Sequence, residues 1–130
     1  MLKNISNLGD AALYCDFGIE VNKKINSEVI KYFEAIKGSN IEGINNLTPS
    51  YNKLIISYDL RLTNFNDVKK KIETLNINET VKIYSKKLII PVCCENEFSL
   101  DIERLEKKIN LSREKILENF FNKEYFCYMT

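Results

Sequence analysis

Two spacings of hydrophobic residues alternate along the chain, and they predict where strands and helices lie. Residues 11–17 alternate apolar and less apolar side chains, which is the pattern of a half-buried strand. Residues 26–37 repeat apolar side chains at helical spacing, and Gly38 suits the position just past a helix C-terminus. The front of the chain therefore predicts a strand followed by an amphipathic helix.

The next stretch predicts a hairpin and a second helix. Residues 41–48 form a weak strand candidate and residues 53–59 a clear one, separated by the polar turn of residues 49–52. Asn64 is placed to cap a helix whose apolar stripe runs through residues 65–75.

An apolar run then predicts a fourth strand. Residues 81–84 read as a short strand or extended linker, and residues 87–93 as a continuous apolar strand. Pro91 lacks an N–H donor, so this strand is expected to end there or to lie at a sheet edge. The order βαββαβ predicts a ferredoxin-like, two-layer α+β sandwich, with both helices on one face of an antiparallel sheet.

The last third predicts two added short helices and a final strand. Ser99 is expected to cap the first helix and Ser112 the second, and residues 125–129 alternate as a strand would. A chain that stops inside a strand leads us to expect the front part of a longer protein. The side chains expected to face inward from the two helices are Ile102, Leu105, Ile109, Ile116, Leu117, Phe120 and Phe121.

Composition narrows the classes of function. The 130 residues fit one domain, and 19 basic against 18 acidic residues give a net charge of +1. Such a balance provides no field for steering toward nucleic acid or a membrane surface, so we expect neither as a partner. The chain has no apolar run of membrane-spanning length and no secretory signal, which favours the cytoplasm. The four cysteines are accordingly expected to be reduced thiols.

The chemistry available to the chain is limited because it contains no histidine. Cys93 and Cys94 could form a nucleophile, a redox pair or half of a metal site, but their spacing favours ordinary buried or half-buried thiols. Glu95, Glu97 and Asp101 could form an acid/base pair or a magnesium site, but a polar loop leading into a helix N-terminus is the simpler interpretation.

Two further sets of residues have both a functional and a structural interpretation. Asp10 follows Gly9 and could bind a ligand, or could be a turn residue that bonds its own backbone. Aromatic residues at predicted strand positions are expected in the core rather than as base-stacking platforms, because no basic groove accompanies them. These aromatic residues are Tyr51, Tyr58, Tyr125, Phe126 and Tyr128.

Several motifs occur in an order and spacing that resemble one family. Their main members are Gly9, Asp10, Phe17, Gly18, Pro49, Tyr51, Tyr58, Asp59, Pro91, Val92, Cys93, Glu97, Phe98, Asp101 and Tyr125. Together they resemble the B subunit of bacterial 5-oxoprolinase, also labelled as the first subunit of allophanate hydrolase or as a carboxyltransferase C-D domain. The family includes an inhibitor of a sporulation histidine kinase.

The chain departs from that family's pattern at two places. Cys94, Glu95 and Asn96 stand where the family usually has a Gly-Gly turn, which puts a close backbone approach there in doubt. Phe120 stands where the family usually has a histidine, so any role of that histidine is lost here.

The resemblance implies that residues 1–130 are a single N-terminal domain, without the cyclophilin-like barrel that follows in the family. It implies a non-catalytic docking part of a protein that, with other 5-oxoprolinase subunits, converts 5-oxoproline to glutamate at the expense of ATP. The domain itself is expected to bind no cofactor and no metal, and no catalytic residue is assigned. An alternative is a module that binds the phosphotransfer domain of a histidine kinase, and a third is a structural domain without separate activity. The candidate partner-binding residues are Phe120, Phe121 and Tyr128.

Overall fold

The structure is a computed structural model that describes residues 2–77 and 86–129. The chain divides into two compact units, one made of residues 1–84 with 128–130, the other of residues 85–127. We call the described part of the first the sandwich unit and that of the second the helical unit, and each is treated by itself.

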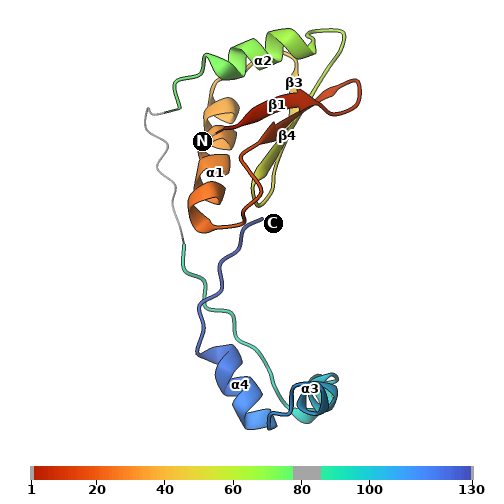
Figure 1. The fold of residues 1–130 in the computed structure, drawn as a ribbon, viewed down its shortest axis with the longest axis vertical. Coiled ribbons are helices and arrows are strands. Elements are labelled where there is room, and N and C mark those ends of the chain that lie inside the picture. The colour runs from red at the N-terminus through yellow and green to blue at the C-terminus, as the bar shows by residue number, and fades with distance from the viewer. Residues whose placement is uncertain (1, 78–85, 130) are drawn as a thin grey trace. The chain divides into compact units, whose positions relative to one another are not determined.

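The sandwich unit is built on a four-stranded antiparallel sheet (Figure 1). Its strands are β1 (Asn4–Asn7), β2 (Ala12–Asp16), β3 (Ile44–Pro49) and β4 (Lys53–Tyr58), in the spatial order β1-β2-β4-β3. Burial alternates along β2 and β4, so every second side chain of these central strands points into one core.

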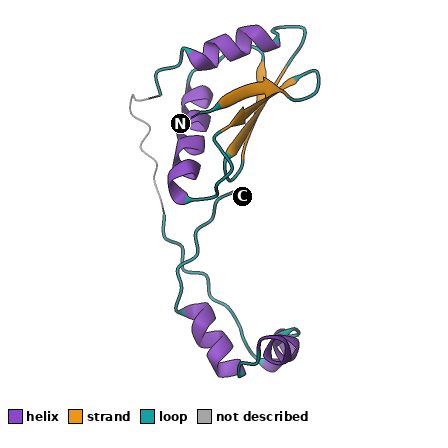
Figure 2. Ribbon diagram, viewed as in Figure 1, coloured by secondary structure: helices purple, strands orange, loops and turns teal. Residues whose placement is uncertain are grey.

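Helices α1 (Lys23–Gly38) and α2 (Phe65–Glu73) cover the same face of that sheet (Figures 1 and 2). Each begins at an asparagine whose side chain accepts a backbone N–H: Asn22 from Ile25 at 2.9 Å, and Asn64 from Asp67 at 3.1 Å. The buried apolar side chains between the two layers are Ile5, Leu13, Cys15, Phe17, Val29, Ile36, Leu54, Ile56, Tyr58, Val68 and Ile72. They form a single hydrophobic core.

The predicted class, an α+β two-layer sandwich on a four-stranded antiparallel sheet, is confirmed, but the prediction for the fourth strand is wrong. The edge beside β2 is occupied by β1, and residues 87–93 form no strand. The element order is therefore ββαββα. The β1–β2 connection is a tight hairpin with Gly9 at a φ of 63°, which costs far less closure entropy than a strand from the distant apolar run. The predicted element at residues 81–84 lies outside the described residues.

The helical unit contains a 3₁₀ turn, η1 (Asn96–Phe98), and two helices, α3 (Ile102–Ile109) and α4 (Arg113–Phe121). Ser112 caps α4 as predicted, accepting the N–H of Lys115 at 3.4 Å. The cap predicted at Ser99 is wrong, because α3 begins after Asp101 and Ser99 closes η1 instead.

Two other predictions for the end of the chain are also wrong. Residues 125–129 form no strand. None of the described residues 86–127 is buried, so the apolar side chains of α3 and α4 do not form a core of their own. None of the helices in the described part of the chain has the length and hydropathy that a membrane span needs.

Candidate functional site

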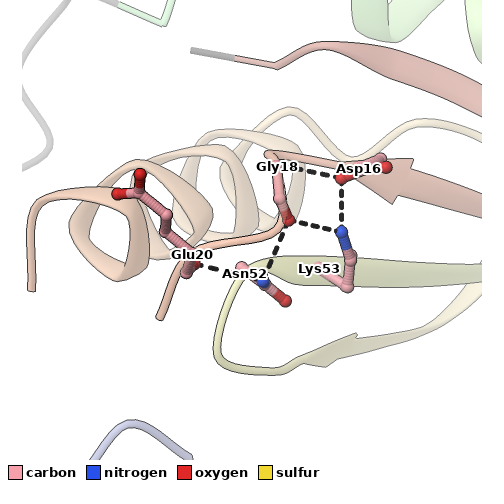
Figure 3. A network of polar contacts seen from close by, with 5 residues as sticks. All are labelled: Asp16, Gly18, Glu20, Asn52 and Lys53. Carbon is pink, nitrogen blue, oxygen red and sulfur yellow. Dashed lines mark hydrogen bonds and ion pairs between the residues drawn. The ribbon is translucent and has the colours of Figure 1, made fainter. Parts of the chain in front are cut away.

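A polar corner at the end of β2 brings the predicted motif residues Phe17 and Gly18 against the start of β4 (Figure 3). Phe17 points into the core, where its ring contacts Tyr32 edge-on with centroids 5.2 Å apart. Its backbone N–H donates to the carbonyl of Asn52 at 3.1 Å. The turn after β2 is thus held by an aromatic anchor on its inner side.

Asp16 organises the outer side of this corner. Its Oδ1 accepts the Gly18 N–H at 2.7 Å and an N–H from the Lys53 ammonium, which also donates to the Gly18 carbonyl at 2.6 Å. The Asn52 side-chain amide donates to the carbonyls of Gly18 and Glu20 at 2.9 and 3.1 Å (Figure 3). These bonds join the turn after β2 to the first residues of β4.

The charges of the corner are mutually compensated. Hydrogen bonds from Lys53 and from the Gly18 backbone hold the pKa of Asp16 below its ordinary value, with smaller help from the charges of Lys53 and Lys3. The Lys53 ammonium also lies 5.9 Å from the centre of the Tyr14 ring. A carboxylate kept ionised in this way is a poor general base, so the corner is suited to fixing the backbone rather than to moving protons.

A second group of motif residues meets at the opposite end of the central strands. The Tyr58 hydroxyl donates to the backbone carbonyl of Asp10 at 3.1 Å, and Gly9 supplies the hairpin turn. Asp59 forms a bidentate pair with Arg61, and both backbone and side-chain bonds from Arg61 lower its pKa. Of the predicted core aromatics only Tyr58 is fully buried, and Asp10 contributes a carbonyl, with its side chain exposed.

The third group lies at the β3–β4 turn. Pro49 ends β3, and Tyr51 is an exposed turn residue rather than the predicted core residue. Its ring lies 6.0 Å, centre to centre, from that of Tyr128, which is partly buried. The candidate partner-binding residue Tyr128 therefore belongs to the sandwich unit and contacts this turn.

The remaining motif residues lie in the helical unit, most of them exposed. Pro91, Val92, Phe98, Tyr125 and Phe126 are exposed, which contradicts the core placement predicted for the last two.

The cysteines are reduced, as predicted, but differ in their surroundings. Burial raises the pKa of the Cys15 thiol to about 12. Cys94 is half-buried as expected, whereas Cys93 is exposed, so the prediction for Cys93 is wrong. The strand predicted over residues 87–93 does not form.

Arg113, at the first turn of α4, ties the loop before α3 to that helix. Its guanidinium donates to Asn96 Oδ1 at 2.6 Å, to the Cys94 carbonyl, and to Ser99 Oγ at 3.5 Å. Its backbone N–H donates to the Glu106 carboxylate at 2.8 Å. The stretch from Cys94 to Ser99 is thus held by an arginine fork.

The three candidate acidic residues lie at the surface of the helical unit. Glu95, Glu97 and Asp101 are exposed, and Asp101 pairs with Arg104 at 3.1 Å. Among the residues that the structure describes, no group of three His, Cys, Asp or Glu side chains could hold a metal ion. Glu95 and Glu97 lie at η1, and Asp101 lies just before α3.

Phe120 and Phe121 form the aromatic end of α4. Their rings meet edge-on with centroids 5.3 Å apart, and Phe120 also lies 5.4 Å from Tyr125. The side chains are 46% and 53% exposed, so this cluster presents aromatic surface to solvent.

Three residues that organise these groups were not predicted: Lys53, Arg113 and Asn26, a buried asparagine of α1. Asn26 did carry a signal, because it stands one helical turn before Val29 and Ile30 on the inward stripe, where a polar residue needs a partner. Lys53 and Arg113 carried none, since a charged residue at a strand start or helix start is ordinary.

Known proteins match this chain over most of its length. The B subunit of 5-oxoprolinase from Bacillus subtilis is 29% identical over 137 residues, covering 96% of this chain and 57% of that protein. A solved structure of a conserved uncharacterized protein from Pyrococcus horikoshii is 30% identical, with a TM-score of 0.54, and covers 88% of this chain and 53% of its own.

TTHA0988 has a TM-score of 0.61 at 22% identity, covering 82% of this chain and 19% of its own, and supports the fold alone. The chain spans about half the length of the curated relative it matches. A family model described as carboxyltransferase domain, subdomain C and D, matches residues 3–130. Because this match covers almost every residue, the chain belongs to the carboxyltransferase subdomain C and D family.

Proposed function

We propose that this chain is the non-catalytic docking part of a cytoplasmic protein resembling the B subunit of 5-oxoprolinase, which hydrolyses 5-oxoproline to glutamate together with other subunits. The observation that carries the proposal is the similarity to that relative along 96% of the chain. The name of the relative describes one subunit among several, so a surface for binding another subunit is required of it.

We assign this surface to the helical unit. It exposes Phe120 and Phe121 on α4 and lacks a buried side chain among its described residues. Contiguous exposed apolar surface is typical of a protein-binding site, and aromatic side chains are enriched among the residues that dominate interface energies.

ATP and the reacting amide are assigned to other parts of the complex. The chain has no histidine, and Asp16, Asp59 and Asp101 are paired with Lys53, Arg61 and Arg104. We therefore expect the isolated chain to be catalytically inert and to need no cofactor.

The test is reconstitution of ATP-dependent 5-oxoproline hydrolysis from the subunit containing this chain and its partner subunits. Phe120→Ser with Phe121→Ser is expected to lower binding to the partners at least tenfold and to lower turnover at limiting subunit concentration. Leu60→Ser with Leu62→Ser, two comparably exposed leucines of the sandwich unit, is the matched control and should change neither. Full activity without this subunit would contradict the proposal.

The second candidate is inhibition of a sensor histidine kinase through its helical phosphotransfer domain. It is favoured by the same exposed Phe120–Phe121 pair, because an amphipathic helix needs an apolar surface to dock on. The discriminating measurement is autophosphorylation of the kinase in a large excess of the protein. Unchanged autophosphorylation together with restored 5-oxoproline hydrolysis would leave the first proposal standing alone.

A further inference from the structure

The chain leaves the sandwich unit before the helical unit and rejoins it at Tyr128. The residue that contacts Tyr128 there is Asn26, the fourth residue of α1. The Asn26 side chain is only 3% exposed. It is the only polar residue that is fully buried among those described. A buried carboxamide requires hydrogen-bond partners, so the groups it binds indicate its purpose.

All three acceptors bound by the Asn26 amide nitrogen are backbone carbonyls. Nδ2 donates to Ser50 and Tyr51 at 3.2 Å each, and to Tyr128 at 3.0 Å. Because an amide nitrogen carries two hydrogens, one of them is shared between two acceptors. The shortest of the three bonds goes to Tyr128, which is 102 positions away in the chain.

Two side-chain contacts place the same two segments against each other. The ring of Tyr128 lies over that of Tyr51 with a tilt of 55°. The Ser50 hydroxyl donates to Met129 Sδ at 3.7 Å. Residues 50–51 and residues 128–129 therefore meet at consecutive positions, with the Asn26 amide binding the main chain of both.

We propose that Asn26 is the anchor that holds residues 128–129 to the sandwich unit. Recognition is of a main-chain carbonyl and does not depend on the side chain at position 128. The inference does not depend on the proposed function. A purely local role, satisfying the β3–β4 turn, would involve only Ser50 and Tyr51.

The native protein provides the first test. The chain has two methionines, so ¹³C-methyl methionine labelling yields only Met129 and the reference Met1. We expect a Met129 methyl signal shifted by the nearby tyrosine rings, and nuclear Overhauser contacts from the Asn26 side-chain amide to the α-protons of residues 128 and 129. If the Asn26 amide contacts only residues 50 and 51, the proposal is overturned.

The second test compares two isosteric changes near the β3–β4 turn, one at Asn26 in α1 and one at Asn52 in the turn itself. Asn26→Asp puts a carboxylate against three carbonyl oxygens, and it should move the Met129 methyl signal to its position in urea-unfolded protein. Asn52→Asp alters an amide that donates to Gly18 and Glu20, and should leave the Met129 signal in place. A Met129 signal that stays in place in folded Asn26→Asp protein, or that moves equally in both variants, would contradict the anchor. If Asn26→Asp does not fold, the contacts in the native protein decide.

Discussion

The two units of this chain contain similar amphipathic helices, but only the sandwich unit buries the apolar stripes of its helices. In the sandwich unit, the apolar stripes of α1 and α2 are buried against a sheet, and Val29, Val68 and Ile72 are excluded from water. In the helical unit, α3 and α4 contact each other, yet none of their side chains is buried. Two short helices cannot bury their apolar stripes completely unless a further element packs against them.

This difference indicates which unit holds the stability of the chain, and it supports the docking role proposed for the other unit. The hydrophobic contribution to folding scales with the apolar area removed from water, so the sandwich unit holds nearly all of it. The helical unit relies on local devices instead, chiefly the Ser112 cap and the Arg113 fork. Apolar side chains that are not used for folding remain available for another surface.

The largest expected effect is on the stability of the buried core of the sandwich unit. Leu54→Ala removes a side chain that is 0% exposed in β4 and should cost about 2–5 kcal/mol of the free energy of unfolding. Leu105→Ala makes the same chemical change in α3, where the side chain is 37% exposed, and should cost less than about 1 kcal/mol. Urea unfolding measures both. Equal losses would remove the distinction between the units.

The next effect is on partner binding by the exposed aromatic residues of the helical unit. Phe120→Ala should weaken the affinity for other 5-oxoprolinase subunits by about 2 kcal/mol, as for an aromatic hot-spot residue, while leaving the unfolding midpoint of the sandwich unit unchanged. Calorimetric titration and urea unfolding of the same variant give the two numbers. A variant that binds normally but unfolds more easily would assign Phe120 to folding.

A smaller effect tests the local devices of the helical unit. Arg113→Met removes the bonds to Asn96 and Ser99 and should cost about 1 kcal/mol locally, raising amide exchange in residues 94–99 about fivefold. Amide exchange in β2 and β4 should not change. Ser112→Ala, which removes the α4 cap, is a control expected to raise exchange in the first turn of α4 rather than in the loop.

The smallest effect comes from the ion pair at the corner of the sandwich unit. The pKa of Asp16 is lowered in the folded protein, so its contribution is fully present above its ordinary pKa of 3.8 and is lost as the pH falls through the lower folded value. Asp16→Asn should therefore cost at most about 1 kcal/mol at pH 7, and progressively less as the pH falls through the folded pKa of Asp16. Urea unfolding across the acid range measures the difference. A cost that does not change with pH would assign the effect to packing.

The sequence predicted those elements whose buried side chains recur at a regular period. Residues 11–17, 26–37 and 53–59 follow the periods expected of β2, α1 and β4, and the Asn64 cap is present. The hairpin strand β1 was missed because Ile5 is its only fully buried side chain, too little to produce a period.

The failures share a physical cause. Residues 87–93 and 125–129 have strand composition, but a strand forms only where another strand's hydrogen-bonding edge is available, and composition does not reveal that. The same limit applies to the site. The motif residues could be identified from the sequence, whereas the bonds made by Asn26, Lys53 and Arg113 depend on segments brought together by folding.

Amide hydrogen exchange of the protein containing this chain, alone and in complex with the other 5-oxoprolinase subunits, tests the central claim most directly. We expect the amides of β2 and β4 to be strongly protected in both states, whereas those of α3 and α4 exchange quickly alone and at least tenfold more slowly in the complex. Strong protection of α3 and α4 in the isolated protein, or a complex that leaves their exchange unchanged, would contradict the assignment of docking to the helical unit.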